Sequence, residues 1–318
     1  MGQQIRNAIG LDHDSQSIRA VKLSSGQGKS GGGDYNIVST AELRGNFNDE
    51  ATLVEALKRL REKISITPLD KVVTCVSGKQ TYAAQIPVRK LPEEEMKSML
   101  TLEMRKTIPF EVSGATVDFQ FLPADPARKS DAVQVMVSAV ANILLSKHLR
   151  TFEKAGIKPH VVDVLPLAVA NAFWALRKEN RTSKETQVII HVGPKTSTLV
   201  IDGDNNTFFN RSIYFNAYEI FGDQSEQTVP TEEAQFRMDT FAGEIMKSLT
   251  FYESTYQSGK FSTILLLGNF TAHRLCDALT HRTGLTAQPM ETVQKLNHKK
   301  ALLPGKYDLS AALAMRAG

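Results

Sequence analysis

The first 80 residues alternate between short apolar runs and polar turns, which predicts an α/β lobe that opens with a hairpin. Two strand-like segments flank a polar turn at residues 12–16. A helix is indicated over 49–64, where apolar residues recur at helical spacing, and it ends before Pro68. Strands are predicted at 8–11, 17–23, 35–38 and 72–76. A strand, a helix and a strand in this order are typical of an α/β lobe.

A glycine- and serine-rich stretch at 24–33 contains Gly28, Lys29 and Ser30, the end of a phosphate-loop motif. A phosphate loop would also need a glycine where Leu23 stands and a helix directly afterwards. The residues from Asp34 onward look extended instead. We therefore interpret this stretch as a hairpin loop.

The pattern changes between residues 81 and 165, where a small α/β unit of its own is predicted. A strand at 82–88 leads into Leu91, Pro92 and three glutamates, a typical helix start. That helix runs to about Thr107. Strands at 115–122 and 132–141 and a helix over 143–155 complete the unit.

A second strand–turn–strand unit follows a hydrophobic helix at 166–179. Its strands are predicted at 188–190 and 196–202, around a turn at 191–195. A third strand over 207–215 extends it, and a polar stretch at 223–233 precedes a long helix that ends near Ser258. A buried strand at 263–267 runs into Gly268 and Asn269, with another helix from Thr271.

The composition is that of a globular protein, with 42% apolar and 23% charged residues and a net charge of +4 over 318 residues. Basic and acidic residues are interspersed, which argues against a nucleic-acid surface. Cys75 and Cys276 have no metal-ligand spacing and read as buried thiols in a reducing compartment. Without a signal peptide or an apolar run of about 18 to 20 residues, we expect a cytoplasmic protein with no direct membrane insertion.

The two hairpins are the most informative feature for function. Paired hairpins can face each other across a cleft and aim backbone N–H groups at phosphate oxygens from both sides. Small or hydroxyl residues at the turns allow this approach, and a carboxylate on each hairpin arranges metal and water. Two ordinary hairpins remain the alternative, because strand–turn–strand units are common.

Several segments spread over the chain resemble the PilM family of type IV pilus assembly proteins. Ile9 to Asp12 is similar to the first phosphate hairpin of PilM and of the related cell-division protein FtsA. Similar segments follow in the family's order at 102–110, 162–168, 197–200, 211–213, 241–252 and 307–316. The resemblance covers nearly the whole chain.

This resemblance implies an actin-like (ribonuclease H-like) two-lobed α/β fold with a small α/β insertion subdomain. The first lobe would comprise 1–80 and 166–186, with the insertion at 81–165 between them. The second lobe would comprise a core at 187–222 and 262–302 and a helical segment at 223–261. A closing helix at 303–318 would return to the first lobe.

The family resemblance also implies an ATP site, but several of its residues are replaced. Asp14 stands where the family has a glycine, His191 where it has an aspartate, and Asn269 where it has the second of two glycines. A second negative charge disfavours a polyphosphate unless a metal offsets it. The residues that remain for nucleotide binding are Asp12, Ser15, Gly193, Thr196, Glu244, Lys247 and Gly268.

We therefore expect either no cofactor or weakly bound ATP with Mg, no catalytic residues and no resident metal. Each candidate also has a structural explanation. Asp12 can be a turn former, Glu244 and Lys247 a solvated helix face, and His191 a packed histidine. An active actin-like ATPase whose nucleotide state regulates assembly is the alternative function. A kinase on the same fold is disfavoured by His191, since a kinase needs a carboxylate base.

In the family, the insertion and the first lobe form a groove for the cytoplasmic tail of PilN, a bitopic membrane protein. The helix at 93–107 carries Met96, Met99, Leu100 and Met104, and flexible methionines suit a peptide groove. Alternatively, this face packs on the insertion's own strands. The resemblance implies a position peripheral to the inner membrane through partners, and it leaves contacts with a cytoplasmic motor ATPase and a homo-oligomer open.

Overall fold

The computed structural model describes most of the chain. The described residues are 7–25, 35–89, 91–105, 108, 110–122, 132–174, 186–203, 207–222, 231–256, 261–271, 273–291, 293, 296, 302 and 304–317. The Gly28–Ser30 motif lies outside them, as does the end of the predicted helix beyond Trp174.

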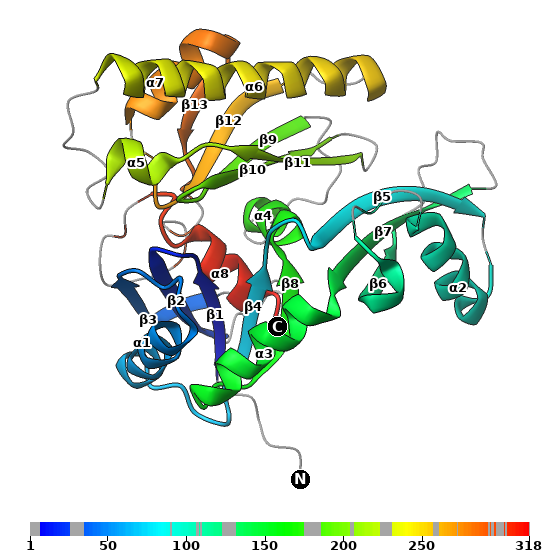
Figure 1. Ribbon diagram of the computed structural model, residues 1–318, viewed down its shortest axis with the longest axis vertical. Helices are drawn as coiled ribbons and strands as arrows, with labels where there is room; N and C mark the ends of the chain where they lie inside the picture. Colours follow the sequence, from blue (N-terminus) through cyan, green and yellow to red (C-terminus); the bar gives the residue numbers. More distant parts are fainter. Residues whose placement is uncertain are drawn as a thin grey trace.

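The first lobe is built on a five-stranded sheet in the order β3-β2-β1-β4-β8. Its first three strands form an antiparallel meander, and β4 and β8 continue in parallel. The helices α1 (Glu50–Lys63) and α3 (Asn142–Lys154) cover its outer face (Figure 1). The strands are β1 (Ala8–His13), β2 (Ser17–Ser25), β3 (Tyr35–Arg44), β4 (Lys71–Val76) and β8 (Pro159–Val164).

The second lobe repeats this plan, with the order β11-β10-β9-β12-β13 and the same pattern of antiparallel and parallel pairs. Its outer face is covered by α6 (Glu232–Tyr256) and α7 (His273–Thr283) (Figure 1). The short helix α5 (Ala217–Phe221) follows the third strand. The strands are β9 (Thr186–Val192), β10 (Thr196–Asp202), β11 (Phe208–Tyr214), β12 (Phe261–Gly268) and β13 (Thr286–Pro289).

Two apolar helices, α4 (Leu165–Trp174) and α8 (Asp308–Met315), lie between the two sheets (Figure 1). They share one hydrophobic cluster with residues of both lobes, including Val73 from β4 and Ile189 from β9. The Trp174 indole N–H also donates to the Asp202 carboxylate of β10. The lobes are therefore joined by a continuous core.

Gly10 explains how α8 reaches the first sheet so closely. A Cβ at Gly10 would lie 1.8 Å from the Ser310 carbonyl oxygen and 2.4 Å from the Ala314 backbone nitrogen. Both are main-chain atoms of α8 that cannot swing away. The glycine is therefore required by helix packing.

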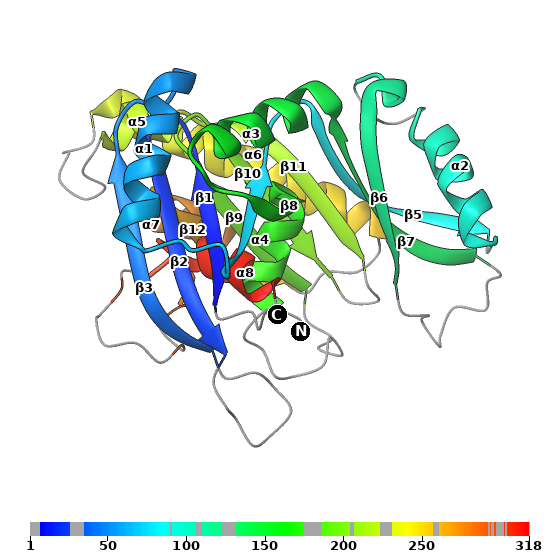
Figure 2. The same cartoon turned by 90° about the horizontal axis from the view of Figure 1, so that it is seen from below.

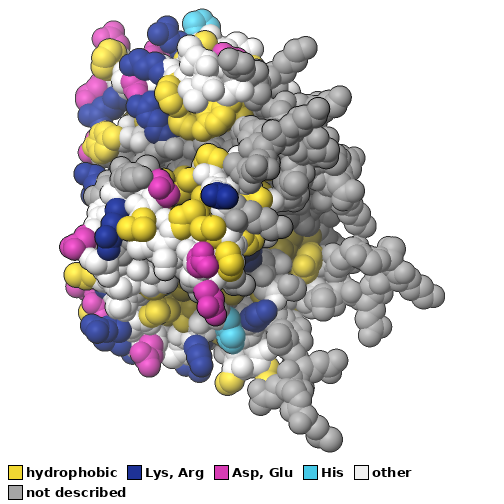
Figure 3. Space-filling model, turned by 90° about the vertical axis from the view of Figure 1, so that its right-hand side faces the viewer, with side chains coloured by type: hydrophobic (Ala, Val, Ile, Leu, Met, Phe, Trp, Pro, Cys, Tyr) yellow, Lys and Arg dark blue, Asp and Glu magenta, His cyan; other side chains and the backbone are white. Residues whose placement is uncertain are grey.

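The insertion is a three-stranded sheet, β5-β7-β6, with α2 (Glu93–Met104) on one face. It projects to one side of the lobes (Figure 2). Apolar side chains gather at mid-height on the face that it presents, among single charged ones (Figure 3). Its strands are β5 (Thr81–Arg89), β6 (Ala115–Phe121) and β7 (Ala132–Ala141).

The insertion's own sheet ends at Ala141, whereas the sequence placed the boundary at 165. The intervening α3 packs beside α1, and β8 pairs in parallel with β4, so both are parts of the first lobe. The insertion also contacts the second lobe, because the Phe208 N–H donates to Gln85 Oε1 at 3.0 Å and Asn210 Nδ2 donates to the Ala83 carbonyl at 2.7 Å.

The predicted hairpins at 9–23 and 188–201 are confirmed, as are both buried free cysteines. Among the described residues, no helix is long and apolar enough to cross a bilayer.

Candidate functional site

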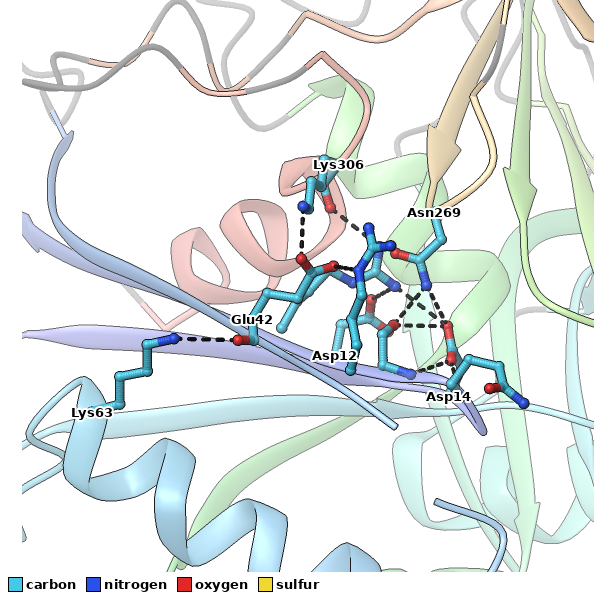
Figure 4. A network of polar contacts seen from close by, with 10 residues as sticks. Asp12, Asp14, Glu42, Lys63, Asn269 and Lys306 are labelled. Carbon is cyan, nitrogen blue, oxygen red and sulfur yellow. Dashed lines mark hydrogen bonds and ion pairs between the residues drawn. The ribbon is translucent and has the colours of Figure 1, made fainter. Parts of the chain in front are cut away.

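The two hairpin turns approach each other between the lobes, and the side chain of Asn269 connects the second lobe to the first hairpin. Asn269 follows β12 in the second lobe, and its Nδ2 donates to Ser17 Oγ at 2.6 Å and to Asp14 Oδ2 at 3.2 Å (Figure 4). Asp14 and Ser17 both belong to the first hairpin. The sequence predicted that Asn269 narrows the space for a base, and in the structure its amide bonds to the opposite lobe.

The carboxylate of Asp14 accepts hydrogen bonds from backbone N–H groups of its own turn. Asp14 Oδ1 accepts from the Gln16 N–H at 2.7 Å and from the Ser17 N–H at 2.8 Å. Successive backbone N–H groups in a turn form a concavity that binds anions, and an aspartate that accepts from the backbone two residues on forms an Asx turn. The donors that could hold a phosphate oxygen are therefore already paired with a carboxylate of the chain.

Arg19 supplies the countercharge for this turn. Its guanidinium lies 2.9 Å from Asp12 and 3.4 Å from Asp14, and its side chain is 1% exposed. It also donates to the Lys306 carbonyl oxygen just before α8, at 3.2 Å. Asp12, a candidate ligand by sequence, is therefore bound within a buried ion pair.

Glu42 and Lys306 extend the network toward the surface (Figure 4). Lys306 Nζ lies 2.7 Å from Glu42 Oε2. Partial burial acts to raise the pKa of Glu42, but the hydrogen bond and charge of Lys306, together with the charges of Arg44 and Arg19, lower that pKa. Sequence reasoning missed Arg19, Glu42 and Lys306; the available signal was an arginine between the apolar Ile18 and Ala20 of a predicted strand.

His191 stands on the second hairpin and is 5% exposed. Burial lowers its pKa, against the raising effect of Asp12. Within the described part of the chain neither ring nitrogen has a hydrogen-bond partner. Gly268 pairs with Val192 at the end of β9, and the next residue, Asn269, bonds to the first hairpin, so the two hairpins lie close to each other.

Among the remaining hairpin candidates, the two glycines are closely surrounded by backbone atoms. A Cβ at Gly193 would lie 2.6 Å from the Thr196 carbonyl oxygen, and one at Gly268, whose φ is +114°, would lie 2.6 Å from the Val192 carbonyl oxygen. The Ser15 carbonyl accepts from the Phe47 N–H at 2.9 Å. Thr196 is exposed at the start of β10.

Little space is left beside this network. The pocket around Gln16, Ser17 and Asn269 has a volume of about 20 Å³, which is room for about one water molecule.

Glu244 and Lys247 do not join the hairpins. They pair with each other at 2.6 Å on α6, and Glu244 also binds Arg211 of β11 at 2.9 Å. Their helix α6 covers the face of the second sheet that points away from the first lobe (Figure 1), and the ion-pair partners of Glu244 and Lys247 belong to the second lobe. Their contacts are those of a solvated helix face.

The candidate partner residues on α2 need a correction. Met96, Leu100 and Met104 are fully buried in the insertion's own core, where they pack on Val135 and Val137 of β7. A peptide cannot contact them while α2 stays on its sheet. Met99 is half-buried, and Leu102, on the same helix, is 56% exposed.

The comparisons with known proteins agree with this architecture. A family model described as type IV pilus assembly protein PilM matches residues 10–229. No curated protein sequence matches. A chain solved in a PilM–PilN type IV pilus biogenesis complex is similar over 98% of both chains, with a TM-score of 0.77 and 19% identity.

Two further solved structures match over most of the chain. The ethanolamine utilization protein EutJ from Carboxydothermus hydrogenoformans has a TM-score of 0.53 at 9% identity, over 97% of this chain and 89% of its own. A Bacteroides thetaiotaomicron protein with an actin-like ATPase fold has a TM-score of 0.48 at 10% identity, over 98% and 96% of the two chains. The fold is the actin-like, two-lobed α/β fold.

Proposed function

The chain belongs to the PilM family of type IV pilus assembly proteins, and from this premise we propose that it is a cytoplasmic scaffold with a non-functional nucleotide site. It would serve the assembly platform of a type IV pilus or a related secretion system and bind the cytoplasmic tail of a PilN-like inner-membrane protein. Contacts with a motor ATPase and with further copies of the chain stay predictions.

The observation that carries the loss of nucleotide binding is the position of the Asp14 carboxylate. It takes the N–H groups of Gln16 and Ser17 at 2.7 and 2.8 Å. A nucleotide phosphate would have to displace a carboxylate that is also paired with Arg19 and Asn269. Displacing it would leave two acidic side chains, Asp12 and Asp14, facing a polyanion.

Calorimetric titration of the full chain with Mg-ATP tests this part of the proposal. We expect no binding heat at micromolar protein and no phosphate release above the buffer rate. Tight binding, or release of phosphate that depends on the protein, would favour the alternative function of an active ATPase that regulates pilus assembly.

For the tail, we propose a docking surface on the exposed side of α2 and the adjoining insertion. The support is an exposed apolar surface there: Leu102 is 56% exposed, and Phe121 at the end of β6 is 44% exposed. Apolar side chains also gather at mid-height on the face that Figure 3 shows. A similar chain was solved in a complex with PilN, and this supports a PilN-like tail as the occupant of the surface.

Point variants test tail docking better than deletion of the insertion, because deleting residues 82–159 would also remove α3 from the first lobe. We expect Leu102→Glu to weaken capture of the PilN-like tail at least about tenfold, since it places a charge on an apolar contact. Phe236→Glu is the matched control, because Phe236 is 71% exposed on α6. Unchanged capture by the Leu102 variant would place the tail elsewhere.

A further inference from the structure

The outer surface of the first lobe carries a groove that neither the nucleotide cleft nor the insertion uses. It lies between the first residue of α1, Glu50, and the solvent-facing side of α3, and its volume is about 420 Å³. The main residues of its α3 wall are Ile143, Lys147, Arg150 and Lys154. The two helices lie together on the outer face of the sheet (Figures 1 and 2).

These four residues of α3 form a single stripe. They are spaced by four, three and four positions, which places them above one another on one side of a helix. The stripe begins with an apolar side chain, since Ile143 is 73% exposed, and continues with three cations. With a rise of about 1.5 Å per residue, it is about 16 Å long.

The acidic wall of the groove is already engaged at one end. Lys154 Nζ lies 2.6 Å from Glu50 Oε1, and this hydrogen bond lowers the pKa of Glu50. Neither Lys147 nor Arg150 forms an ion pair with a described residue, although the charge of Lys147 also lowers the pKa of Glu50. The groove therefore has three cations against one carboxylate, and it presents a net positive charge next to an exposed isoleucine.

We propose that this groove docks an extended acidic segment of a partner protein, with one apolar side chain against Ile143 and carboxylates against Lys147 and Arg150. The charge of the groove selects an acidic occupant. Its length corresponds to about five residues of extended chain at about 3.3 Å each. The stripe of α3 and Glu50 at the start of α1 line this space together, and an extended segment can lie along the stripe.

This site goes beyond the proposed function, because it adds a second partner on α3 of the first lobe, beside the insertion, where Thr116 of β6 donates to Asn142 of the groove. A scaffold with both sites can hold a membrane-anchored tail and an acidic segment of another protein at the same time. Opposite-charge recognition also accelerates association and makes it dependent on ionic strength.

Fluorescence anisotropy with the full chain tests the groove. The probe is a labelled hexapeptide of one leucine followed by five glutamates, and the control peptide has lysines in place of the glutamates. We expect the acidic peptide alone to bind in 50 mM salt and to weaken strongly in 500 mM salt. The double variant Lys147→Glu with Arg150→Glu should bind it about tenfold more weakly or worse.

The matched control is Lys58→Glu with Arg59→Glu, which makes the same charge change at exposed positions of α1 outside the groove. It should bind the peptide nearly as the wild type does, and Ile143→Asp should bind it less. Tail capture, run in parallel, should be unchanged in the Lys147/Arg150 variant, which separates a failure here from a failure of the tail proposal.

Three outcomes would overturn the proposal. The first is binding of the acidic peptide no tighter than that of the lysine peptide. The second is an equal loss in both charge variants, which would show a general charge effect. The third is loss, in the Lys147/Arg150 variant alone, of self-association by light scattering or of binding to phosphatidylserine vesicles, with no effect on the peptide. Circular dichroism establishes that each variant is folded.

Discussion

The two hairpins that face each other between the lobes have the same strand register but different side chains at matching positions. Seven positions separate Asp12 from its cross-strand partner Arg19, and seven separate His191 from Thr198. In the first hairpin this pair is a buried ion pair. In the second it is a neutral imidazole opposite a threonine. The two hairpins therefore share a backbone register and differ in the side chains that fill it.

The two hairpins also differ two residues earlier in their first strands. Gly10 pairs with Val21 in the first hairpin, and Ile189 pairs with Val200 in the second, at the same offset. Gly10 admits the backbone of α8, whereas Ile189 fills the hydrophobic cluster between the lobes. The two hairpins thus share one backbone framework while their matching positions serve different contacts.

The largest effect is expected from breaking the ion pair of the first hairpin. Arg19→Met leaves the Asp12 carboxylate buried without a countercharge and should lower the free energy of unfolding by about 3 to 5 kcal/mol. Thr198→Val at the matching position should cost less than about 1.5 kcal/mol. Urea unfolding measures both. If Asp12→Asn combined with Arg19→Met is as unstable as Arg19→Met alone, the uncompensated charge is not the cause.

Adding a methyl group at Gly10 should have the next largest effect. Gly10→Ala forces a Cβ against main-chain atoms of α8 and should destabilise the protein by about 3 kcal/mol. Gly243→Ala is the matched control on α6, where no neighbour lies within 4 Å of the added Cβ, and it should be neutral or stabilising by up to about 1 kcal/mol. Equal effects in the two variants would contradict the packing role of Gly10.

Removing the Asp14 carboxylate from the first turn should allow weak anion binding there. Asp14→Gly removes the carboxylate from the amide groups of Gln16 and Ser17 and leaves Arg19 nearby. We expect Mg-ATP to bind with a Kd on the order of 1 mM by calorimetry, where the wild type gives no heat. Asp14→Asn keeps a side-chain acceptor at the turn and should give no binding heat. If Asp14→Gly also gives no binding heat, the hydrogen bonds of Asn269 across the lobes are enough to exclude the nucleotide.

The smallest effect concerns pH. Burial lowers the pKa of His191 below 6.5, so between that value and the folded pKa the unfolded chain binds a proton that the folded chain does not. The free energy of unfolding therefore falls as the pH drops below about 6.5. His191→Gln should reduce this loss by about 1 kcal/mol between pH 6.5 and 5.5. His13 and His148, whose pKa values are also lowered by burial, continue to contribute. Identical pH profiles would show that His191 is not involved.

Much of the fold followed from the sequence, because apolar periodicity directly reflects which face of an element is buried. Both hairpins, α1 and β4 lie close to their predicted positions. The edge strands β8 and β13 were not predicted, since short strands such as Thr286–Pro289 carry little pattern. The insertion boundary moved from 165 to 141 because periodicity does not tell which sheet a strand joins.

The site could be located from the sequence but not understood from it. The acidic replacement at position 14 was visible and predicted repulsion of a phosphate, yet its occupation of the turn's own amides depends on side-chain direction. Arg19 acquires its role only through cross-strand pairing. An amphipathic pattern also does not tell which partner a face has, so Met96, Leu100 and Met104 allowed a reading as a peptide groove beside that of a core.

The close packing of α8 on β1 at Gly10 has a consequence for biosynthesis. Its binding surface on β1 emerges first from the ribosome, and α8 itself follows about 300 residues later, which at about 5 to 20 residues per second is a delay on the order of 15 to 60 s. During that interval the strand around Gly10 exposes an apolar surface that only α8 can cover. Nascent chains stalled before residue 308 should therefore recruit holding chaperones, and those extended past residue 317 should release them.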